Sequence, residues 1–426
     1  MANAASPSTY EILTIKKDGR EVRLDGRTTS FDYYESLLSP NVTATMTFVD
    51  TGDSIEASQK TDRQPRTGTI YNTLPITGEE ELRFKIRSKL GTLDFSREPL
   101  VVNSAVNLDQ ESQRESVLLS LVSKQGTENL NIPLSKKYDG RISDSVRRIL
   151  KEEFKITDDK IDIEPTKLSY SFQGYTDSPF ENIIDLASKS TPESGNPGFF
   201  FYQTQNKFNF KSIDGLISAP EKAVYFSSAV NKSSIEDDSN DNKILSYSIN
   251  KNQNLLNALK SGVYISRNIF FDPRTFKYKE IIYTLTDGKL EKSLGSDPYI
   301  PKDIKSYSRT HSHILDIGFH SEGIDTKANN NPEEYQAKAT MRYNLLFSQV
   351  VSMMVPCNPN LKAGDTIRCE FEKITLSEKE QGSFDQNQSG KYLILNLCHH
   401  FDTKNSFTSL TLVRDSYGIY TNKNKG

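Results

Sequence analysis

The chain has 426 residues, with 53 basic and 56 acidic side chains and a formal net charge of −3. This length is enough for two to four domains, and the balanced charge argues against a surface that follows nucleic-acid phosphates. A hydrophobic content of 35%, with 20 Tyr and 22 Phe, is low for one large enzyme core and suits several small β domains with aromatic surfaces.

The first residues, the lengths of the apolar runs and the cysteines indicate the compartment. Residues 1–9 have neither a basic region nor an apolar region, so we expect a flexible tail rather than a signal peptide. No window approaches 18 apolar residues, so we expect no membrane insertion. Only Cys357, Cys369 and Cys398 occur, and this odd number without a regular framework predicts free thiols in a reducing compartment.

Residues 10–123 have the pattern of β structure throughout, and we expect them to form a first β-barrel domain. Polar and apolar residues alternate in 42–48 and again in 82–86, which is typical of strands with one buried face. Two further apolar runs, 100–106 and 117–122, flank a polar connection.

Residues 124–219 predict a small α+β domain of two helices and a hairpin. Apolar residues in 142–154 keep helical spacing. A second helix begins at Ser178-Pro179, where Glu181 completes a capping box. The apolar runs around the turn Gln205-Asn206 predict the hairpin.

We expect residues 220–287 and 331–415 to form a second β-barrel domain, interrupted by a looped excursion at 288–330. A long hairpin turns at Asp272-Pro273, and a helix follows Asn331-Pro332. Three apolar runs of strand length then lie at 367–371, 392–397 and 407–413. The middle run lacks alternation, so both of its faces should be covered. Residues 416–426 predict a C-terminal tail.

The two β regions share an order of features. In each region a Pro/Gly turn and an acidic residue lead into a strand, as in Pro75, Gly78 and Glu79 and in Pro359, Gly364 and Asp365. An apolar strand with an asparagine, a polar loop and a closing strand follow in both. This order favours a structural duplication, although two β hairpins can resemble each other by chance.

Enzyme motifs are mostly missing from the sequence. There is no GxxxxGK[ST] loop, GxGxxG turn, HExxH helix, paired CxxC or GxSxG elbow. Cys398 and His399 are adjacent in an expected strand, so they should face opposite sides and cannot act as an acid–base pair. We therefore expect no enzyme activity, no catalytic residue and no cofactor.

The only spacing that suits a metal is His311-Ser-His313, with His320 downstream. On a strand the first two histidines share a face that a metal could use, and ordinary polar loop residues are the alternative. We expect no metal at these three residues.

Three ordered stretches carry a resemblance: YYESLLSPNVTATMTFVD with LPITGEEELRFKI, SPFENIIDLASKS followed by GNPGFFFYQTQNKFNFKSIDGL, and LKAGDTIRCEF followed by SGKYLILNLCHHFDTKNSFTSLTLVRDSYG. Together they resemble the central baseplate hub proteins of T-even-type contractile-tailed (myovirus) phages, especially of cyanophage relatives. The positions that carry this family-like signature are Pro75, Gly78, Phe180, Gly364, Asp365, Gly390, Tyr392, His399, Arg414 and Asp415.

The resemblance implies a mainly β fold with an α+β insertion: two similar antiparallel β-barrel-like domains, a small α+β domain and the looped excursion. It also implies a homotrimer that acts as a symmetry adaptor between the trimeric tail spike and the sixfold tail tube or tube-initiator proteins, and that contacts the inner baseplate wedge proteins. DNA would pass through the central channel without specific binding. The protein would assemble in the host cytoplasm and reside in the tail baseplate of the virion. A tail-associated cell-wall hydrolase and a carbohydrate-binding tail module are the alternatives.

Overall fold

The computed structural model describes residues 6–52, 69–70, 74, 76–111, 114–174, 177–227, 240–250, 255–285, 292–296, 306, 309–318, 332–375 and 383–418. Two of the expected positions, Pro75 and His320, lie outside these residues.

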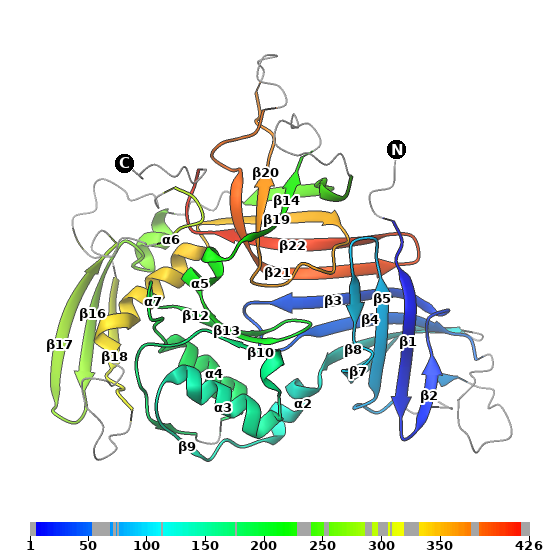
Figure 1. Cartoon of the computed structure of the whole chain (residues 1–426), viewed down its shortest axis with the longest axis horizontal. Helices are drawn as coiled ribbons and strands as arrows, with labels where there is room; N and C mark the ends of the chain where they lie inside the picture. The colour runs from blue at the N-terminus through cyan, green and yellow to red at the C-terminus, as the bar shows by residue number, and fades with distance from the viewer. Residues whose placement is uncertain are drawn as a thin grey trace.

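Most of the strands belong to one long and mainly antiparallel sheet (Figure 1). Its path runs β15, β19, β22, β21, β3, β4, β8, β7, β5, β1 and β2, with β6 on β5 and with β20 joining β21 to β14. In chain order the strands are β1 (Thr9–Lys17), β2 (Arg20–Arg23), β3 (Thr28–Ser36), β4 (Thr43–Asp50), β5 (Glu81–Arg87), β6 (Thr92–Asp94), β7 (Leu100–Glu111), β8 (Arg114–Ser123), β14 (Glu221–Phe226), β15 (Ser246–Asn250), β19 (Gln349–Pro356), β20 (Thr366–Glu370), β21 (Gly390–Asp402) and β22 (Ser406–Arg414).

The first part of this sheet, β1 to β8, surrounds one apolar core. The alternation predicted from the sequence is confirmed there, since Val42 just before β4 and Ala44, Met46 and Phe48 on β4 are all buried. The core also takes Phe401 from β21, which lies opposite Phe31 of β3. The two ends of the chain therefore share a core.

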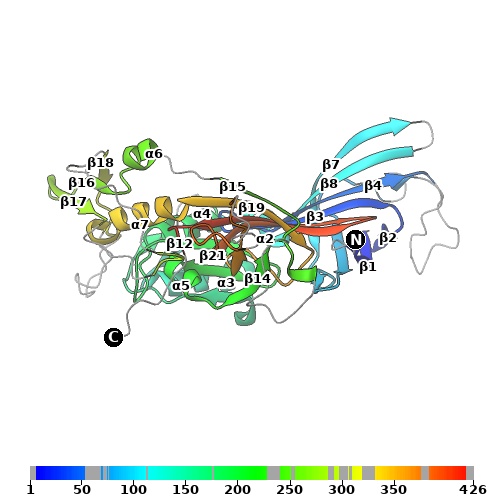
Figure 2. The same cartoon turned by 90° about the horizontal axis from the view of Figure 1, so that it is seen from above.

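The polar stretch 107–116 differs from the expectation. Its described residues, 107–111 and 114–116, are not a loose connection, because they belong to β7 and β8 and stay paired as far as Glu111 opposite Arg114. Polar residues suit this extension because it projects beyond the core (Figure 2), where a strand needs no apolar face.

The closed barrels expected from the sequence are not found among the described residues. The structure has instead one open sheet that passes from one β region to the other through β3 and β21. The reason is the length of β21, which has 13 residues. Its first residues pair with β20, and after a bulge the rest pair with β3, so the sheet continues instead of closing.

The α+β insertion packs beneath the junction of the two β regions (Figure 1). Its second helix begins with the predicted capping box, in which Ser178 and Glu181 each bond the other's backbone N–H. Its elements are α2 (Lys124–Asn131), β9 (Lys137–Tyr138), α3 (Ile142–Phe154), η1 (Asp158–Lys160), β10 (Ile161–Ile163), β11 (Phe172–Gln173), α4 (Pro179–Ser188), β12 (Phe199–Gln203), β13 (Phe208–Ser212) and α5 (Ile213–Ser218).

The insertion explains why the middle apolar run of the C-terminal region has no alternation. On β21, Tyr392 and Ile394 face the second β core, whereas Leu393 and Leu395 pack against residues of β12 and α5. Both faces of this run are covered, as predicted.

A separate three-stranded sheet lies at one end of the elongated molecule (Figure 2). The predicted hairpin forms two of its strands, and the third lies in the stretch that was expected to be a loop. Helix α7 (Pro332–Leu346) contacts this sheet and leads into β19. The remaining elements are η2 (Asn240–Asn242), α6 (Leu255–Lys260), β16 (Ile265–Asp272), β17 (Lys277–Thr284), β18 (Arg309–Ile314) and α7 (Pro332–Leu346). No helix in the described part of the chain is long and apolar enough to cross a membrane.

Candidate functional site

Cys398 and His399 lie on opposite faces of β21, as the sequence predicts. His399 is buried against Tyr33, and its Nδ1 lies 2.9 Å from Thr408 Oγ1. Burial lowers the pKa of His399 to about 4. Cys398 points the other way, and burial raises the pKa of its thiol to about 12. The sheet therefore separates the Cys398 thiol from the His399 imidazole, so His399 cannot take up the proton of this thiol.

His311 and His313 share a face of β18, with ring centroids 6.0 Å apart. His313 Nε2 lies 3.3 Å from Asn268 Oδ1, and burial lowers the pKa of both histidines. Within the described ranges, no group of three or more His, Cys, Asp or Glu side chains could hold a metal ion. His320 lies outside the described residues, so the absence of a metal at these three histidines stays a prediction.

The signature positions do not converge on one site. Gly390, Tyr392 and Arg414 lie together: the Arg414 guanidinium lies 5.2 Å from the centroid of the Tyr392 ring, and a Cβ on Gly390 would lie 3.0 Å from Arg414 Nη2. Phe180 belongs to the core of the α+β insertion, where it stacks on Phe154 with centroids 4.8 Å apart. Gly78 and Gly364 mark corresponding turns of the two β regions, and Asp365 Oδ2 accepts a hydrogen bond from the backbone N–H of Lys362. Asp415 belongs to a separate ion cluster.

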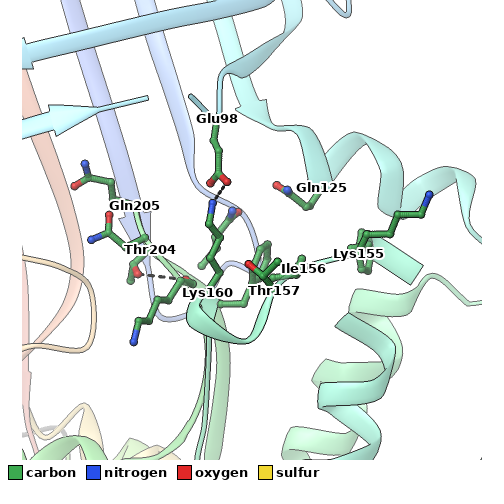
Figure 3. Close-up of a pocket in the computed structure, with 13 residues that line it drawn as sticks. Glu98, Gln125, Lys155, Ile156, Thr157, Lys160, Thr204 and Gln205 are labelled. Carbon is green, nitrogen blue, oxygen red and sulfur yellow. Dashed lines mark hydrogen bonds and ion pairs between the residues drawn. The ribbon is translucent and has the colours of Figure 1, made fainter. Parts of the chain in front are cut away.

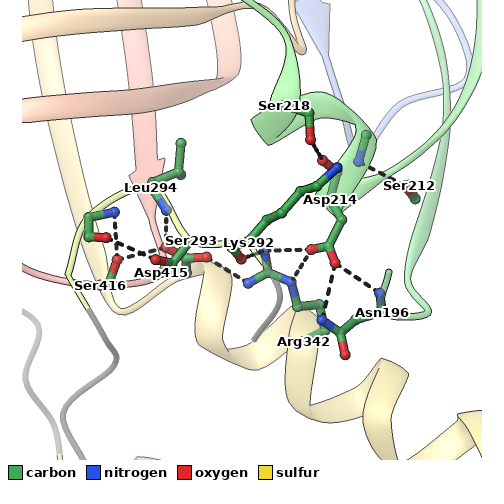
Figure 4. Close-up of polar contacts among 12 residues, drawn as sticks. Asn196, Ser212, Asp214, Ser218, Lys292, Ser293, Leu294, Arg342, Asp415 and Ser416 are labelled. Atoms are coloured by element: carbon green, nitrogen blue, oxygen red, sulfur yellow. Dashed lines mark hydrogen bonds and ion pairs between the residues drawn. The ribbon is translucent and has the colours of Figure 1, made fainter. Parts of the chain in front are cut away.

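That ion cluster is centred on Arg342 of α7 (Figure 4). Arg342 Nε donates to Asp214 Oδ1 at 3.0 Å, and Nη1 donates to Asp415 Oδ2 at 2.7 Å. Lys292 O accepts from Nη2 at 3.2 Å. The side chains of Arg342 and Asp415 are 0% exposed and that of Asp214 is 2% exposed. The cluster ties α5, α7, the end of β22 and the segment 292–296 together.

This cluster was not predicted from the sequence, although one signal was present. Arg342 is seven residues after Tyr335 and three after Ala339, so helical spacing places it on the same side of the helix as these two apolar residues, which are buried. A basic residue on the buried face of a helix requires buried acidic partners. The sequence gives no means of choosing Asp214 and Asp415 as those partners, because they are far away along the chain.

A second buried carboxylate, Glu35 of β3, lies where three parts of the fold meet. Glu35 Oε1 accepts hydrogen bonds from the backbone N–H of Gln205 at 2.7 Å and from the Tyr33 hydroxyl at 2.8 Å. Glu35 Oε2 accepts from the backbone N–H of Ala363 at 2.9 Å. Glu35 therefore joins the first β region to the turn between β12 and β13 and to the loop before β20. Burial raises the pKa of Glu35 to about 7.

The raised pKa predicts a pH dependence that Glu35→Gln should remove. In the unfolded chain the pKa of Glu35 is about 4.3, so the folded state holds this proton more tightly. The contribution of the proton to the free energy of unfolding is therefore fully present at low pH and is lost as the pH rises through about 7. A shift of this size corresponds to a change on the order of 3 kcal/mol in the free energy of unfolding. Denaturant unfolding at pH 5 and at pH 8 should show that the free energy of unfolding of the wild type falls from pH 5 to pH 8 relative to that of Glu35→Gln.

Glu193→Gln, at an exposed residue, is the control. A difference in the free energy of unfolding between Glu35→Gln and the wild type that is the same at both pH values would contradict the prediction.

The strand pairings of the second β region repeat those of the first. The order β4, β8, β7, β5 corresponds to β19, β22, β21, β20, and every adjacent pair in both sets is antiparallel. The closing strands match as predicted, since Leu121 of β8 lies opposite Val102 and Leu412 of β22 lies opposite Ile394. The regions differ at their edges, because β1 is antiparallel to β5 whereas β14 is parallel to β20.

The turns before β5 and β20 repeat the same pair of backbone hydrogen bonds. In the first region Glu79 N–H donates to Val102 O at 3.0 Å, and Val102 N–H donates to Glu80 O at 2.9 Å. In the second region Gly364 N–H donates to Ile394 O and Ile394 N–H donates to Asp365 O, both at 2.9 Å. A bulge follows both Val102 and Ile394. These hydrogen bonds align Glu79 with Gly364 and Glu80 with Asp365. The sequence patterns had aligned Gly78 with Gly364, one residue earlier in the first turn.

The outer face of the long sheet, which is the face turned away from the two β cores, carries many small hydroxyl residues in both regions. One cross-strand row of this outer face runs from Phe407 on β22 through His400 and Asp32 to hydroxyl residues on β4, β8 and β7. His400 Nδ1 lies 2.5 Å from Asp32 Oδ1. The hydroxyl residues on this face include Ser30, Ser36, Thr43, Thr45, Thr47, Ser104, Ser116, Ser120, Ser248, Ser352, Ser409 and Thr411.

A small pocket lies where the α+β insertion meets the first β region (Figure 3). Its volume is about 170 Å³, and its lining includes Glu98, Gln125, Lys155, Lys160 and Gln205. Glu98 and Lys160 form an ion pair across it. This ion pair joins the segment before β7 to η1 of the insertion.

Comparison with protein-family models and with curated protein sequences finds no match. Comparison with solved structures finds the same fold in two tail proteins. The tail protein from Neisseria meningitidis MC58 superposes with a TM-score of 0.55 at 9% identity, over 96% of this chain and 97% of that chain. The 43 kDa tail protein of prophage MuSo2 from Shewanella oneidensis gives 0.52 at 11% identity, over 96% of this chain and 100% of that chain. This chain therefore shares the fold of tail proteins along nearly its whole length.

Proposed function

We propose that the protein is the central hub of a contractile phage-tail baseplate of the T-even type, and that it acts as a homotrimer without enzymatic activity. The observation that carries this proposal is the repeated strand unit within one chain. Three copies of a chain with two similar units present six similar surfaces, which is what a threefold component needs in order to meet a sixfold one. The fold shared with two tail proteins supports the same role.

The outer face of the long sheet is the surface that we assign to the central channel. Its Ser and Thr residues offer hydroxyl groups but few charges, and Asp32 is paired with His400. A wall without a basic stripe does not hold DNA phosphates, so DNA can pass without being bound.

The remaining partners follow from the same proposal. The repeated units would seat the tail tube or its initiator proteins, and the α+β insertion with the three-stranded sheet would form a collar around the trimeric spike. Inner baseplate wedge proteins would bind around the outside. The protein would then reside in the virion tail after assembly in the host cytoplasm.

Mass photometry of the purified chain tests the trimer. We expect a species of three times the 48.2 kDa of one chain, because six seats require three copies. A clearing assay on purified peptidoglycan and a glycan array should both be negative, which separates the hub from a cell-wall hydrolase and from a carbohydrate-binding module. A monomer at every concentration, or lysis that purified chain alone produces, would contradict the proposal.

A further inference from the structure

The three-stranded sheet exposes an apolar row across its outer face. Phe271 on β16 lies opposite Tyr278 on β17 and is paired with Ile314 on β18. Tyr283 of β17 is five residues after Tyr278, so it lies on the other face, where it packs against α7. Tyr278 is 74% exposed and Ile314 is 72% exposed. The row therefore faces solvent rather than the core of the protein.

The turn between β16 and β17 adds Phe276 to this row. Its ring is 82% exposed and meets the ring of Phe271 edge-on, with centroids 6.4 Å apart. The backbone φ of Phe276 is 55°, a conformation that is unfavourable for a bulky residue and that glycine adopts freely. Asp272 fixes this turn, since its carboxylate accepts hydrogen bonds from the backbone N–H of Arg274 at 2.9 Å and from the Thr275 hydroxyl at 3.1 Å. A fixed turn that holds an aromatic ring outward in a strained conformation indicates a use for that ring. We call four side chains the apolar tip: Phe271, Phe276, Tyr278 and Ile314.

The strands that carry the apolar tip are basic. Together with the β16–β17 turn they contain Arg267, Arg274, Lys277, Lys279 and Arg309 but only Asp272 and Glu280 as acidic residues. Each of these two acidic residues is paired with an arginine. The whole chain has a formal net charge of −3, so this sheet has the opposite sign. Exposed apolar side chains and excess positive charge therefore occur together at this end of the molecule (Figure 1).

The order of residues at the apolar tip distinguishes between a lipid and a protein as its partner. Aromatic rings and lysines alternate along Phe276-Lys277-Tyr278-Lys279. Lysine is depleted in the contact surfaces between proteins. Exposed aromatic residues beside lysine and arginine are typical of surfaces that bind lipid, because the rings lie among the headgroups and the cations meet anionic phosphates. Charge complementarity therefore favours an anionic lipid surface.

We propose that the apolar tip docks on an anionic lipid surface. The rings of Phe276 and Tyr278 lie among the lipid headgroups, and Arg274 and Lys277 contact the phosphate groups. The contact is peripheral, so the backbone stays outside the hydrocarbon layer. This activity goes beyond the hub proposed above, and it does not depend on the number of copies in the assembly.

The first test is sedimentation of the full chain with lipid vesicles. We expect it to sediment with vesicles of phosphatidylcholine and phosphatidylglycerol, and much less with vesicles of phosphatidylcholine alone. Phe276→Gly combined with Tyr278→Ala should lower the partition coefficient by about tenfold or more, because two exposed rings are lost. Lys277→Gln should lower it by about fivefold. Denaturant unfolding should show that Phe276→Gly is no less stable than the wild type, since glycine relieves the strain at this φ.

The second test places a fluorescent probe at the tip. The chain contains no tryptophan, so Phe276→Trp supplies a single indole. Its emission should shift to shorter wavelength when phosphatidylglycerol vesicles are added, because the ring leaves water. Leu130→Trp on α2 is the matched control, since Leu130 is 81% exposed and lies outside the apolar tip. The emission of this control should stay unchanged.

Three results would overturn the proposal. A wild-type chain that sediments with neither kind of vesicle would leave the apolar tip to a protein partner. Equal sedimentation with both kinds of vesicle would exclude the anionic lipid as the preferred surface. Sedimentation that Phe276→Gly with Tyr278→Ala does not lower, or an equal emission shift in Leu130→Trp, would place the lipid contact elsewhere. None of these results changes the mass measured for the assembly, so they are distinct from a failure of the proposed hub.

Discussion

Replacement of Arg342 by methionine is expected to lower the free energy of unfolding by about 3–5 kcal/mol, because it leaves two buried carboxylates without a counter-charge. Asp214 is 2% exposed and Asp415 is 0% exposed at the side chain, so water cannot replace the lost partner. Methionine keeps much of the length and the apolar stem of arginine, so the loss reports mainly on the charge and the hydrogen bonds. Denaturant unfolding at constant pH measures the change.

Arg267→Met is the matched control for this experiment. Arg267 pairs with Glu280 at 2.6 Å on the surface of the three-stranded sheet, with side chains that are 31% and 37% exposed. An exposed pair contributes about 0–1 kcal/mol, so the control should unfold almost as the wild type does. A second test combines Arg342→Met with Asp214→Asn and Asp415→Asn. This triple variant should regain part of the lost stability, because it no longer buries an unpaired charge. Equal losses for Arg342→Met and Arg267→Met would show that the cluster does not hold the four segments together.

Phe31→Ala is expected to destabilise the protein by about 3–5 kcal/mol, since it removes a large aromatic side chain from a packed core. Phe31 is 0% exposed, its ring centroid lies 4.7 Å from that of Phe84, and it lies 6.4 Å from that of Phe401. The cavity would open where β3 meets β21, so the variant should weaken both the first β region and its junction with the C-terminal strands.

The control for Phe31→Ala is Phe276→Ala in the turn of the β16–β17 hairpin. Phe276 is 82% exposed, so its truncation should change the unfolding free energy by no more than about 0.5 kcal/mol. Limited proteolysis adds a readout of location, because loss of packing at the junction should expose the chain between the two β regions. A Phe31→Ala variant as stable as Phe276→Ala would mean that this shared core does not hold the two ends of the chain together.

The sequence by itself determined the local elements of this protein. Alternation of polar and apolar residues located β4 and β5, helical spacing located α3, and the capping box located the start of α4. These features are local because the periods of strands and helices and the satisfaction of helix-end N–H groups depend on neighbouring residues. The repeat of the closing strands was visible for the same reason.

The tertiary structure alone decided how these elements are joined. Among the described residues it has one open sheet in place of two closed barrels, it extends β7 and β8 through the polar residues 107–111 and 114–116, and it brings Arg342 to Asp214 and Asp415. These outcomes depend on which strand edges and which charges meet across hundreds of residues. No local period in the sequence encodes such a meeting, because backbone edges are chemically alike and a buried charge specifies only the sign of its partner.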